Sequence, residues 1–206
     1  MNLSERIFIK LLTLYSTFLG AVLLRLYGVS IGKNLTLTGL PIVSKHKNAS
    51  IWIGNNVMLL SNSITTALGV NHPVILRTLT QNAKIEIGDD VGISGGSICA
   101  GKLVKIGARS MLGANVTIAD TDFHDFSHKN RRYAGLPEEA SFEAVVLKEN
   151  VFVGINTIIL KGVTIGRNTV IGAGSVVTHN IPADSVAAGN PCKVIKALPN
   201  PTRDKK

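Results

Sequence analysis

The sequence predicts an all-β chain: a parallel β-helix of six-residue repeats, with an apolar helix before it and one excursion loop that leaves it. An aliphatic residue recurs every six positions from Leu147 to Val177. Pairs of an aliphatic residue and a glycine recur from Ile31-Gly32 to Ile171-Gly172. Aromatic residues make up only 5% of the 206 residues whereas glycines number 20, which indicates a core of small aliphatic side chains with many tight turns.

The six-residue period excludes two common regular structures. A helix with 3.6 residues per turn cannot keep a strict six-residue apolar period on one face, and a hairpin shows a period of two. A short strand followed by a corner does satisfy the period, with its aliphatic residue pointing inward and Gly or Asn where the corner needs a positive φ. Asn56, Asn115 and Asn168 fit such corners. Three sides give about 18 residues per coil, and successive coils stack at about 4.8 Å.

Residues 1–28 predict an apolar helix with one narrow polar stripe. The longest run without a charge, Leu11 to Leu24, is shorter than the roughly 20 residues that a spanning helix needs. The helix must bury its apolar face in the protein, in a partner subunit or at the membrane interface. Peripheral membrane contact through residues 1–28 is therefore one of three alternatives. The polar positions at helical spacing are Arg6, Lys10, Thr13, Thr17 and Gly20.

The β-helix is expected over residues 29–187, followed by a closing strand and basic tail over 188–206. Residues 58–84 are irregular and predict a distorted coil with a loop. A one-residue slip falls in ICAGKLVKIG, residues 98–107. The largest departure is an excursion loop over 119–146, which opens with ADTDFHDFSHKNRRYAG and is dense in Asp, His and Arg.

The charge and cysteine content narrow the functional classes. The net charge is +9, from 22 Lys and Arg against 13 Asp and Glu. These charges are dispersed and no basic run interleaved with aromatics appears, so we expect no nucleic-acid partner but an anionic small molecule or a membrane surface. Cys99 and Cys192 lie far apart without metal-ligand spacing. We expect reduced thiols, a cytoplasmic location at most peripheral to the membrane, and no metal site.

Three features together resemble one family: the repeats, the interrupting loop with its His, and the ending VIGAGSVVTHNIPADSVAAGNPCKVI over residues 170–195. Over about residues 29–196 the chain resembles the hexapeptide-repeat acyltransferases. These include the galactoside and maltose O-acetyltransferases and the sugar O-acetyltransferases of capsule and O-antigen clusters. The resemblance implies a left-handed β-helix, a homotrimer with sites between subunits, and acetyl-CoA as the donor.

The resemblance also implies a reaction. In that family a loop His is the general base that takes the proton of the acceptor hydroxyl as its oxygen attacks the thioester. His124 matches that His by position, and His128 is the alternative base. Asp122 is the candidate to orient His124, and Asp120 to contact the sugar. The implied function is acetyl-CoA-dependent O-acetylation of a sugar hydroxyl in the biosynthesis of surface polysaccharide or glycolipid.

CoA carries phosphates, so its site needs exposed N–H groups and basic side chains. The resemblance places CoA contacts on the last coils and the tail. His179 stands where a Lys is common in relatives, and Ile155 where a small residue is common, so both departures alter the expected CoA affinity. On the acceptor side Ser94, in the coil before the loop, is the candidate contact. The matched CoA positions are Gly154, Ile155, Ala173, Thr178, His179, Lys193 and Lys196.

Three other functions remain open at this point. An N-acetyltransferase of a nucleotide-linked amino sugar uses the same fold and base. A zinc enzyme like the γ-carbonic anhydrases shares the β-helix, and the loop offers candidate ligands for it. A scaffold without catalysis would bind no CoA. The candidate zinc ligands are Asp120, Asp122, His124 and His128.

Overall fold

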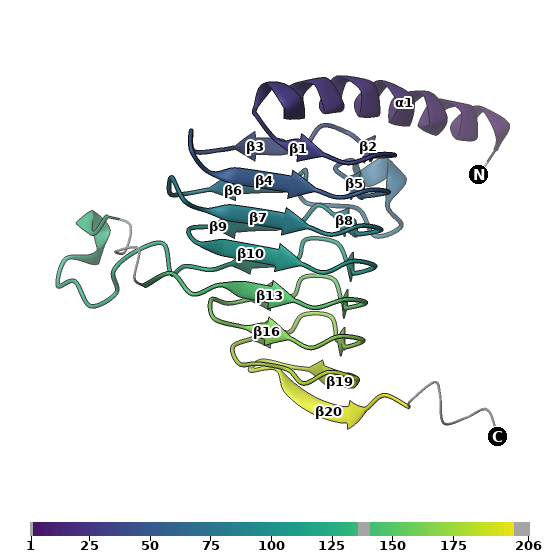
Figure 1. Cartoon of the computed structure of the whole chain (residues 1–206). Coiled ribbons are helices and arrows are strands. Elements are labelled where there is room, and N and C mark those ends of the chain that lie inside the picture. Colours follow the sequence, from purple (N-terminus) through teal and green to yellow (C-terminus); the bar gives the residue numbers. More distant parts are fainter. Residues whose placement is uncertain (1, 136–140, 200–206) are drawn as a thin grey trace.

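The structure, a computed structural model, describes residues 2–135 and 141–199 and shows a three-sided β-helix with one helix across its first coil (Figure 1). The helix is α1 (Leu3–Leu26). Within the described part, parallel sheets of 6, 8 and 6 strands form the three sides, here named A, B and C. The five predicted loop residues 136–140 and the tail from 200 onward lie outside the described residues.

Side A holds β1 (Ser30–Ile31), β4 (Ser50–Ile53), β7 (Lys84–Ile87), β10 (Leu103–Ile106), β13 (Val145–Leu147) and β16 (Thr164–Ile165). Side B holds β2 (Thr36–Thr38), β5 (Met58–Leu60), β8 (Gly92–Ser94), β11 (Met111–Leu112), β14 (Phe152–Val153), β17 (Val170–Ile171), β19 (Ser185–Ala188) and β20 (Lys193–Ala197). Side C holds β3 (Ile42–Ser44), β6 (Ile75–Thr78), β9 (Ser97–Ala100), β12 (Thr117–Ala119), β15 (Ile158–Ile159) and β18 (Val176–Val177). Short 3₁₀ turns are η1 (Ser63–Thr65) and η2 (Arg131–Tyr133).

The chain passes from side A to B to C and then drops to the next coil, so each strand pairs in parallel with the strand one coil away. In Figure 1 side A runs to the right in front and side C runs to the left behind as the chain descends, which is the left-handed sense. The predicted parallel β-helix is therefore confirmed. Among the strands in residues 2–135 and 141–199, the one antiparallel pair is β19 with β20, which closes the last coil.

The repeat period places aliphatic side chains inside the prism. The six residues from Leu147 to Val177 at six-residue spacing are each no more than 1% exposed. The same inward positions in earlier coils are filled by residues such as Ile51, Ile85 and Val104. Because each side is only two to four residues long, this interior has room for aliphatic side chains and little else.

The corner after side A carries a ladder of Asn and Asp residues. Asn56 and Asn168 lie at this corner and Asn115 lies at the B–C corner, with φ values of 55°, 53° and 61°, which confirms their predicted corner role. Along the A–B corner, Asn34 donates to Asn56 at 3.0 Å and Asn56 donates to Asp90 at 2.9 Å. Short amides tolerate the left-handed conformation, and their side chains also tie one coil to the next.

Helix α1 turns its polar stripe toward the prism, contrary to the usual amphipathic arrangement. The hydroxyl of Thr17 accepts a hydrogen bond from the Leu37 N–H at 2.9 Å, and Ser16 accepts one from the Gly39 N–H at 3.1 Å. Strand β2 lies at the open edge of side B, where its backbone groups have no next coil to pair with. The stripe therefore caps an edge of the sheet. Gly20 lets the helix come close to β2, because any side chain at this position would collide with Leu37, whose nearest atom lies 2.3 Å from the Cβ position.

We expect Gly107→Ala to lower the free energy of unfolding by about 1–3 kcal/mol, because a Cβ at Gly107 would lie 2.4 Å from the backbone of Lys148 in the next coil. Gly92→Ala is the matched control, since nothing lies within 4 Å of its Cβ position. Thermal unfolding of both variants checks this prediction. Equal melting temperatures for Gly107→Ala and Gly92→Ala would contradict close stacking of the coils at Gly107.

Candidate functional site

The excursion loop leaves the prism at the C–A corner between β12 and β13 and projects to one side (Figure 1). Within the described residues it encloses a cleft of about 670 Å³ between itself and the prism. The cleft brings together loop residues and Lys161, which belongs to the C–A corner one coil further on. Its polar lining includes Asp122, His124, His128, Tyr133, Glu143 and Lys161.

A strained turn presents His124 to the cleft. Phe123 has a φ of 64°, a left-handed conformation that is costly for a bulky side chain. Its N–H donates to the Thr121 hydroxyl at 3.0 Å, and the His124 N–H donates to the Asp122 carbonyl at 2.8 Å. These two bonds hold the strained conformation. No local sequence signal predicts this turn, because Phe is not a residue that favours a positive φ.

The hydrogen bond of the His124 ring assigns its tautomer. Nδ1 lies 3.0 Å from the carbonyl oxygen of Ala134, and a carbonyl can only accept, so Nδ1 carries the proton. Nε2 then has a free lone pair, and within the described residues no protein group hydrogen-bonds to it. A neutral imidazole with a free Nε2 is the form that a general base requires.

His128 lines the same cleft in the opposite tautomer. The N–H of Asn130 donates to its Nδ1 at 3.0 Å, so Nε2 carries the proton. In this state His128 offers a donor rather than a base. The geometry therefore favours His124 over His128 for proton abstraction.

Asp122 faces Lys161 instead of the His124 ring. Its carboxylate forms an ion pair with Lys161, whose ammonium also lies 3.8 Å from Glu143. The hydrogen bond to Asp122 raises the pKa of Lys161, so the ammonium keeps its charge in the cleft. Asp122 was predicted to orient the His124 ring, but in this structure the Ala134 carbonyl bonds to that ring instead. A backbone carbonyl and a lysine one coil away leave no motif in the sequence, which is why both were missed.

Asp120 does not reach the cleft. It is fully buried, and its carboxylate accepts hydrogen bonds from the N–H groups of Gly101, Lys102 and Leu103 at 2.6–2.7 Å. Those three residues form the shortened corner at the one-residue slip noted in the sequence. Asp120 therefore holds a tight corner of the prism and the start of the loop, and the predicted sugar contact has no support at this position.

The predicted CoA residues divide between two corners of the prism. Gly154, Ile155 and Ala173 lie at the B–C corner, following β14 and β17. Thr178 and His179 follow β18 at the C–A corner, where the Thr178 hydroxyl and His179 Nδ1 are 2.7 Å apart. Lys193 and Lys196 are exposed on β20. None of these seven residues lines the loop cleft.

Ser94 is also separated from His124 within one chain. It ends β8 at the B–C corner, in line with the corners that hold Asn115 and Ile155. The loop with His124 leaves from the C–A corner, so the width of side C lies between the two residues. One chain therefore carries the predicted base on one corner and the predicted acceptor contact on the next.

The candidate zinc ligands do not form a set. Among the described residues, no three His, Cys, Asp or Glu side chains are grouped so as to hold a metal ion. Asp120 is bonded to backbone N–H groups and Asp122 to Lys161, so neither carboxylate is available to join His124. The donor arrangement therefore gives no support to the carbonic-anhydrase alternative.

Comparison with known proteins supplies the identity of the repeat. Residues 144–179 match the bacterial transferase hexapeptide family, described as having six repeats. The chain carries the bacterial transferase hexapeptide repeat. It resembles the hexapeptide-repeat acyltransferases.

Two curated relatives show how far the resemblance extends. The chain is 43% identical over 95 residues to the galactoside O-acetyltransferase of Escherichia coli K12, covering 46% of this chain and 44% of that protein. It is 45% identical over 64 residues to the 2,3,4,5-tetrahydropyridine-2,6-dicarboxylate N-acetyltransferase of Staphylococcus aureus Newman, covering 31% of this chain and 27% of that protein. The chain thus spans less than half the length of these relatives.

Solved structures share the fold over most of the chain. AntD, an N-acyltransferase from Bacillus cereus solved with dTDP and 3-hydroxybutyryl-CoA, has a TM-score of 0.64 at 22% identity, over 87% of this chain and 88% of that one. PerB from Caulobacter crescentus, solved with CoA and GDP-perosamine, has a TM-score of 0.52 at 20% identity, over 86% and 76%. At such identities the likeness shows the fold.

We expect Asp120→Asn to lower the free energy of unfolding by about 2–3 kcal/mol, because an amide replaces a buried carboxylate that accepts three N–H bonds. Asp125→Asn is the control, since Asp125 is exposed in the loop. Chemical denaturation of the two variants measures the difference. If Asp120→Asn were as stable as the control, Asp120 would not be the residue that holds the shortened corner.

Proposed function

We propose that this protein is an acetyl-CoA-dependent acyltransferase that acetylates a sugar hydroxyl, with His124 as the general base. The observation that carries the proposal is the tautomer of His124, which leaves Nε2 free to take a proton in a cleft lined by polar groups. The repeat and the galactoside O-acetyltransferase relatives support transfer from CoA. We infer that the reaction belongs to the assembly of surface polysaccharide or glycolipid.

In the proposed reaction Nε2 of His124 takes the proton of the acceptor hydroxyl as its oxygen attacks the thioester carbon. The tetrahedral intermediate then expels the CoA thiolate, and the proton on the imidazolium is available to that sulfur. The Ala134 carbonyl stabilises the imidazolium through the Nδ1–H bond. The Nε2–H of His128 and the ammonium of Lys161 are the cleft groups that would stabilise the negative charge developing on the thioester oxygen.

Direct transfer fits the state of the cysteines better than a cysteine-bound intermediate does. Burial, with the nearby Asp120 carboxylate, raises the pKa of Cys99 to about 11, and burial raises the pKa of Cys192. Both are free thiols that stay protonated near neutral pH and are poor nucleophiles.

An amine acceptor is the second candidate. The N-acetyltransferase relative from Staphylococcus aureus matches this chain at 45% identity, although over a shorter stretch than the O-acetyltransferase does. A free base at Nε2 serves an ammonium acceptor equally well, since the amine must lose a proton to attack. An acceptor panel that pairs each sugar with its amino-sugar counterpart separates the two candidates.

We further propose a homotrimer whose sites lie between subunits. The support is the split of the site: His124 and Thr178 occupy the C–A corner, while Ser94, Gly154 and Ala173 occupy the B–C corner. A closed ring of chains would bring the C–A corner of one subunit to the B–C corner of the next. Sedimentation equilibrium should return three times the 21.9 kDa mass of the chain, and a single-chain mass would contradict the proposal.

We expect His124→Ala to lower the rate of acetyl transfer about 10² to 10⁴-fold while leaving acetyl-CoA binding intact. Asp122→Asn should lower it less than about tenfold, because the Ala134 carbonyl orients the imidazole instead. Thiol release from acetyl-CoA measures the rate, and a thermal shift with acetyl-CoA measures binding. Full activity in His124→Ala overturns the base assignment, and the absence of any shift in the wild type favours a scaffold.

A further inference from the structure

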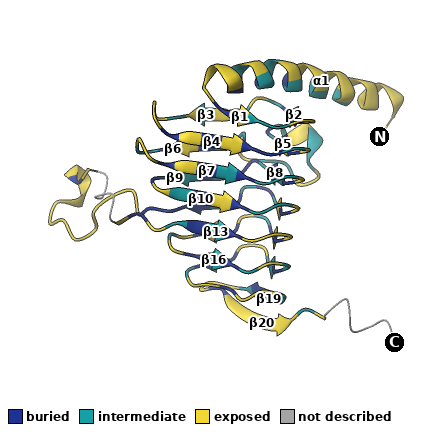
Figure 2. Ribbon diagram, viewed as in Figure 1, coloured by how far each residue is buried: buried dark blue, intermediate teal, exposed yellow. Residues whose placement is uncertain are grey.

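Helix α1 turns a broad apolar face away from the protein. Its buried residues Ser16, Gly20 and Leu24 are spaced by four and lie on one side, toward the prism. The opposite side is largely exposed, as the colouring of α1 in Figure 2 shows, and Phe18 is 74% exposed. The large apolar residues exposed on this segment are Leu3, Ile7, Phe8, Leu11, Leu14, Tyr15, Phe18, Val22, Leu26 and Tyr27. A contiguous apolar face of this kind marks an interaction surface.

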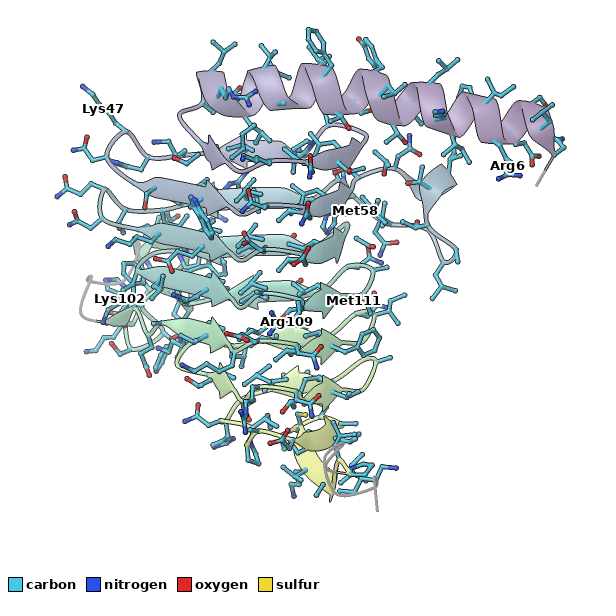
Figure 3. All side chains as sticks on the ribbon, turned by 45° about the vertical axis from the view of Figure 1, so that its right-hand side comes forward. Arg6, Lys47, Met58, Lys102, Arg109 and Met111 are labelled. Atoms are coloured by element: carbon cyan, nitrogen blue, oxygen red, sulfur yellow. The ribbon has the colours of Figure 1, made fainter. Side chains whose placement is uncertain are left out.

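The attachments of α1 keep this face parallel to the end of the prism. The hydroxyl bonds of Ser16 and Thr17 to the first coil fix the middle of the helix flat across it (Figure 3). The uncharged run Leu11 to Leu24 is short for a span, but the whole of α1 is long and apolar enough to cross a bilayer by length and composition. Crossing would break these bonds and uncover the open edge of β2, where backbone groups would lose their partners. The structure therefore presents a helix that lies on a surface.

The end of the prism that carries α1 is positively charged. Residues 2–47 contain one acidic residue, Glu5, against six basic ones. Figure 3 shows Arg6 and Lys47 at the α1 end of the prism. Five of the six basic residues are exposed, and none forms an ion pair with another described residue. The basic residues are Arg6, Lys10, Arg25, Lys33, Lys45 and Lys47.

We propose that α1 docks face-down on the surface of an anionic lipid bilayer. The apolar residues enter the boundary between headgroups and acyl chains, and Tyr15 and Tyr27 keep their hydroxyls near the headgroups. The positive charge of this end attracts anionic lipids. A second copy of this chain is the disfavoured occupant, because face-to-face pairing would bring two basic ends together. The loop leaves the prism at the fourth coil, so three coil spacings, about 15 Å, and the roughly 10 Å width of α1 separate the cleft from the bilayer.

Flotation of the purified chain with vesicles tests the proposal independently of any enzymatic activity. Wild-type protein should float with vesicles of phosphatidylcholine containing phosphatidylglycerol, and less with phosphatidylcholine alone. The double variant Leu14→Glu/Phe18→Glu should lose at least about tenfold in partitioning. Arg6→Gln/Lys10→Gln should bind anionic vesicles several-fold more weakly and neutral vesicles as the wild type does.

Leu68→Glu is the matched control, because Leu68 is 76% exposed and lies outside α1, in the segment between η1 and β6. It should float like the wild type. No flotation of the wild type, or an equal loss in the control, overturns the proposal. So does resistance of the bound protein to extraction with alkaline carbonate, which indicates a spanning helix. If the wild type does not bind vesicles and the mass of Leu14→Glu/Phe18→Glu in solution is half that of the wild type, the face is assigned to a second copy.

Discussion

The close stacking of the coils is the constraint on which the rest of the structure depends. Each side of the prism is two to four residues long, and glycines at the corners bring neighbouring coils together so closely that a Cβ at Gly166 would lie 2.2 Å from the Ala183 backbone. The inward positions therefore accept aliphatic side chains and exclude charged ones. In the described part of the chain the exception is Asp120, whose carboxylate is buried only because three backbone N–H groups satisfy it.

This exclusion determines where chemistry can occur. Polar groups collect at the corners and on the excursion loop, since the interior has no place for them. Asp120 and the buried Phe142 anchor the two ends of the loop to the prism, with Phe142 packed against Gly101. The loop can then carry a strained turn and hold His124 against the Ala134 carbonyl. A rigid prism and an anchored loop together give a general base a defined position.

The same constraint explains the two ends of the molecule. A stack of parallel strands leaves open edges, and each end satisfies them differently. At the last coil β20 pairs antiparallel with β19. At the first coil the hydroxyls of Ser16 and Thr17 bond to the backbone of Leu37 and Gly39. Because the polar side of α1 caps the open edge of the first coil, the apolar face of the helix points away from the prism.

Much of the fold was predictable because it repeats. A six-residue period identifies the inward residues, and Asn56, Asn115 and Asn168 identify corners, since both signals are local. The loop was predictable because it interrupts the repeat, and His124 was singled out within it by the family resemblance. The Ala134 carbonyl, the Asp122–Lys161 pair and the burial of Asp120 were not, because they arise from contacts between distant segments. The orientation of α1 depends on an open sheet edge, which no periodicity within the helix reveals.

Co-expression of two inactive variants tests most directly whether the prism corners of two chains complete one site. His124→Ala removes the base at the C–A corner, and Ala173→Glu places an exposed negative charge at the B–C corner, where CoA phosphates are expected. Each variant alone should be inactive. Randomly assembled trimers should together recover about a quarter of the wild-type activity, because on average one interface in four pairs two intact halves. Mixtures as inactive as the separate variants would contradict a site shared between subunits.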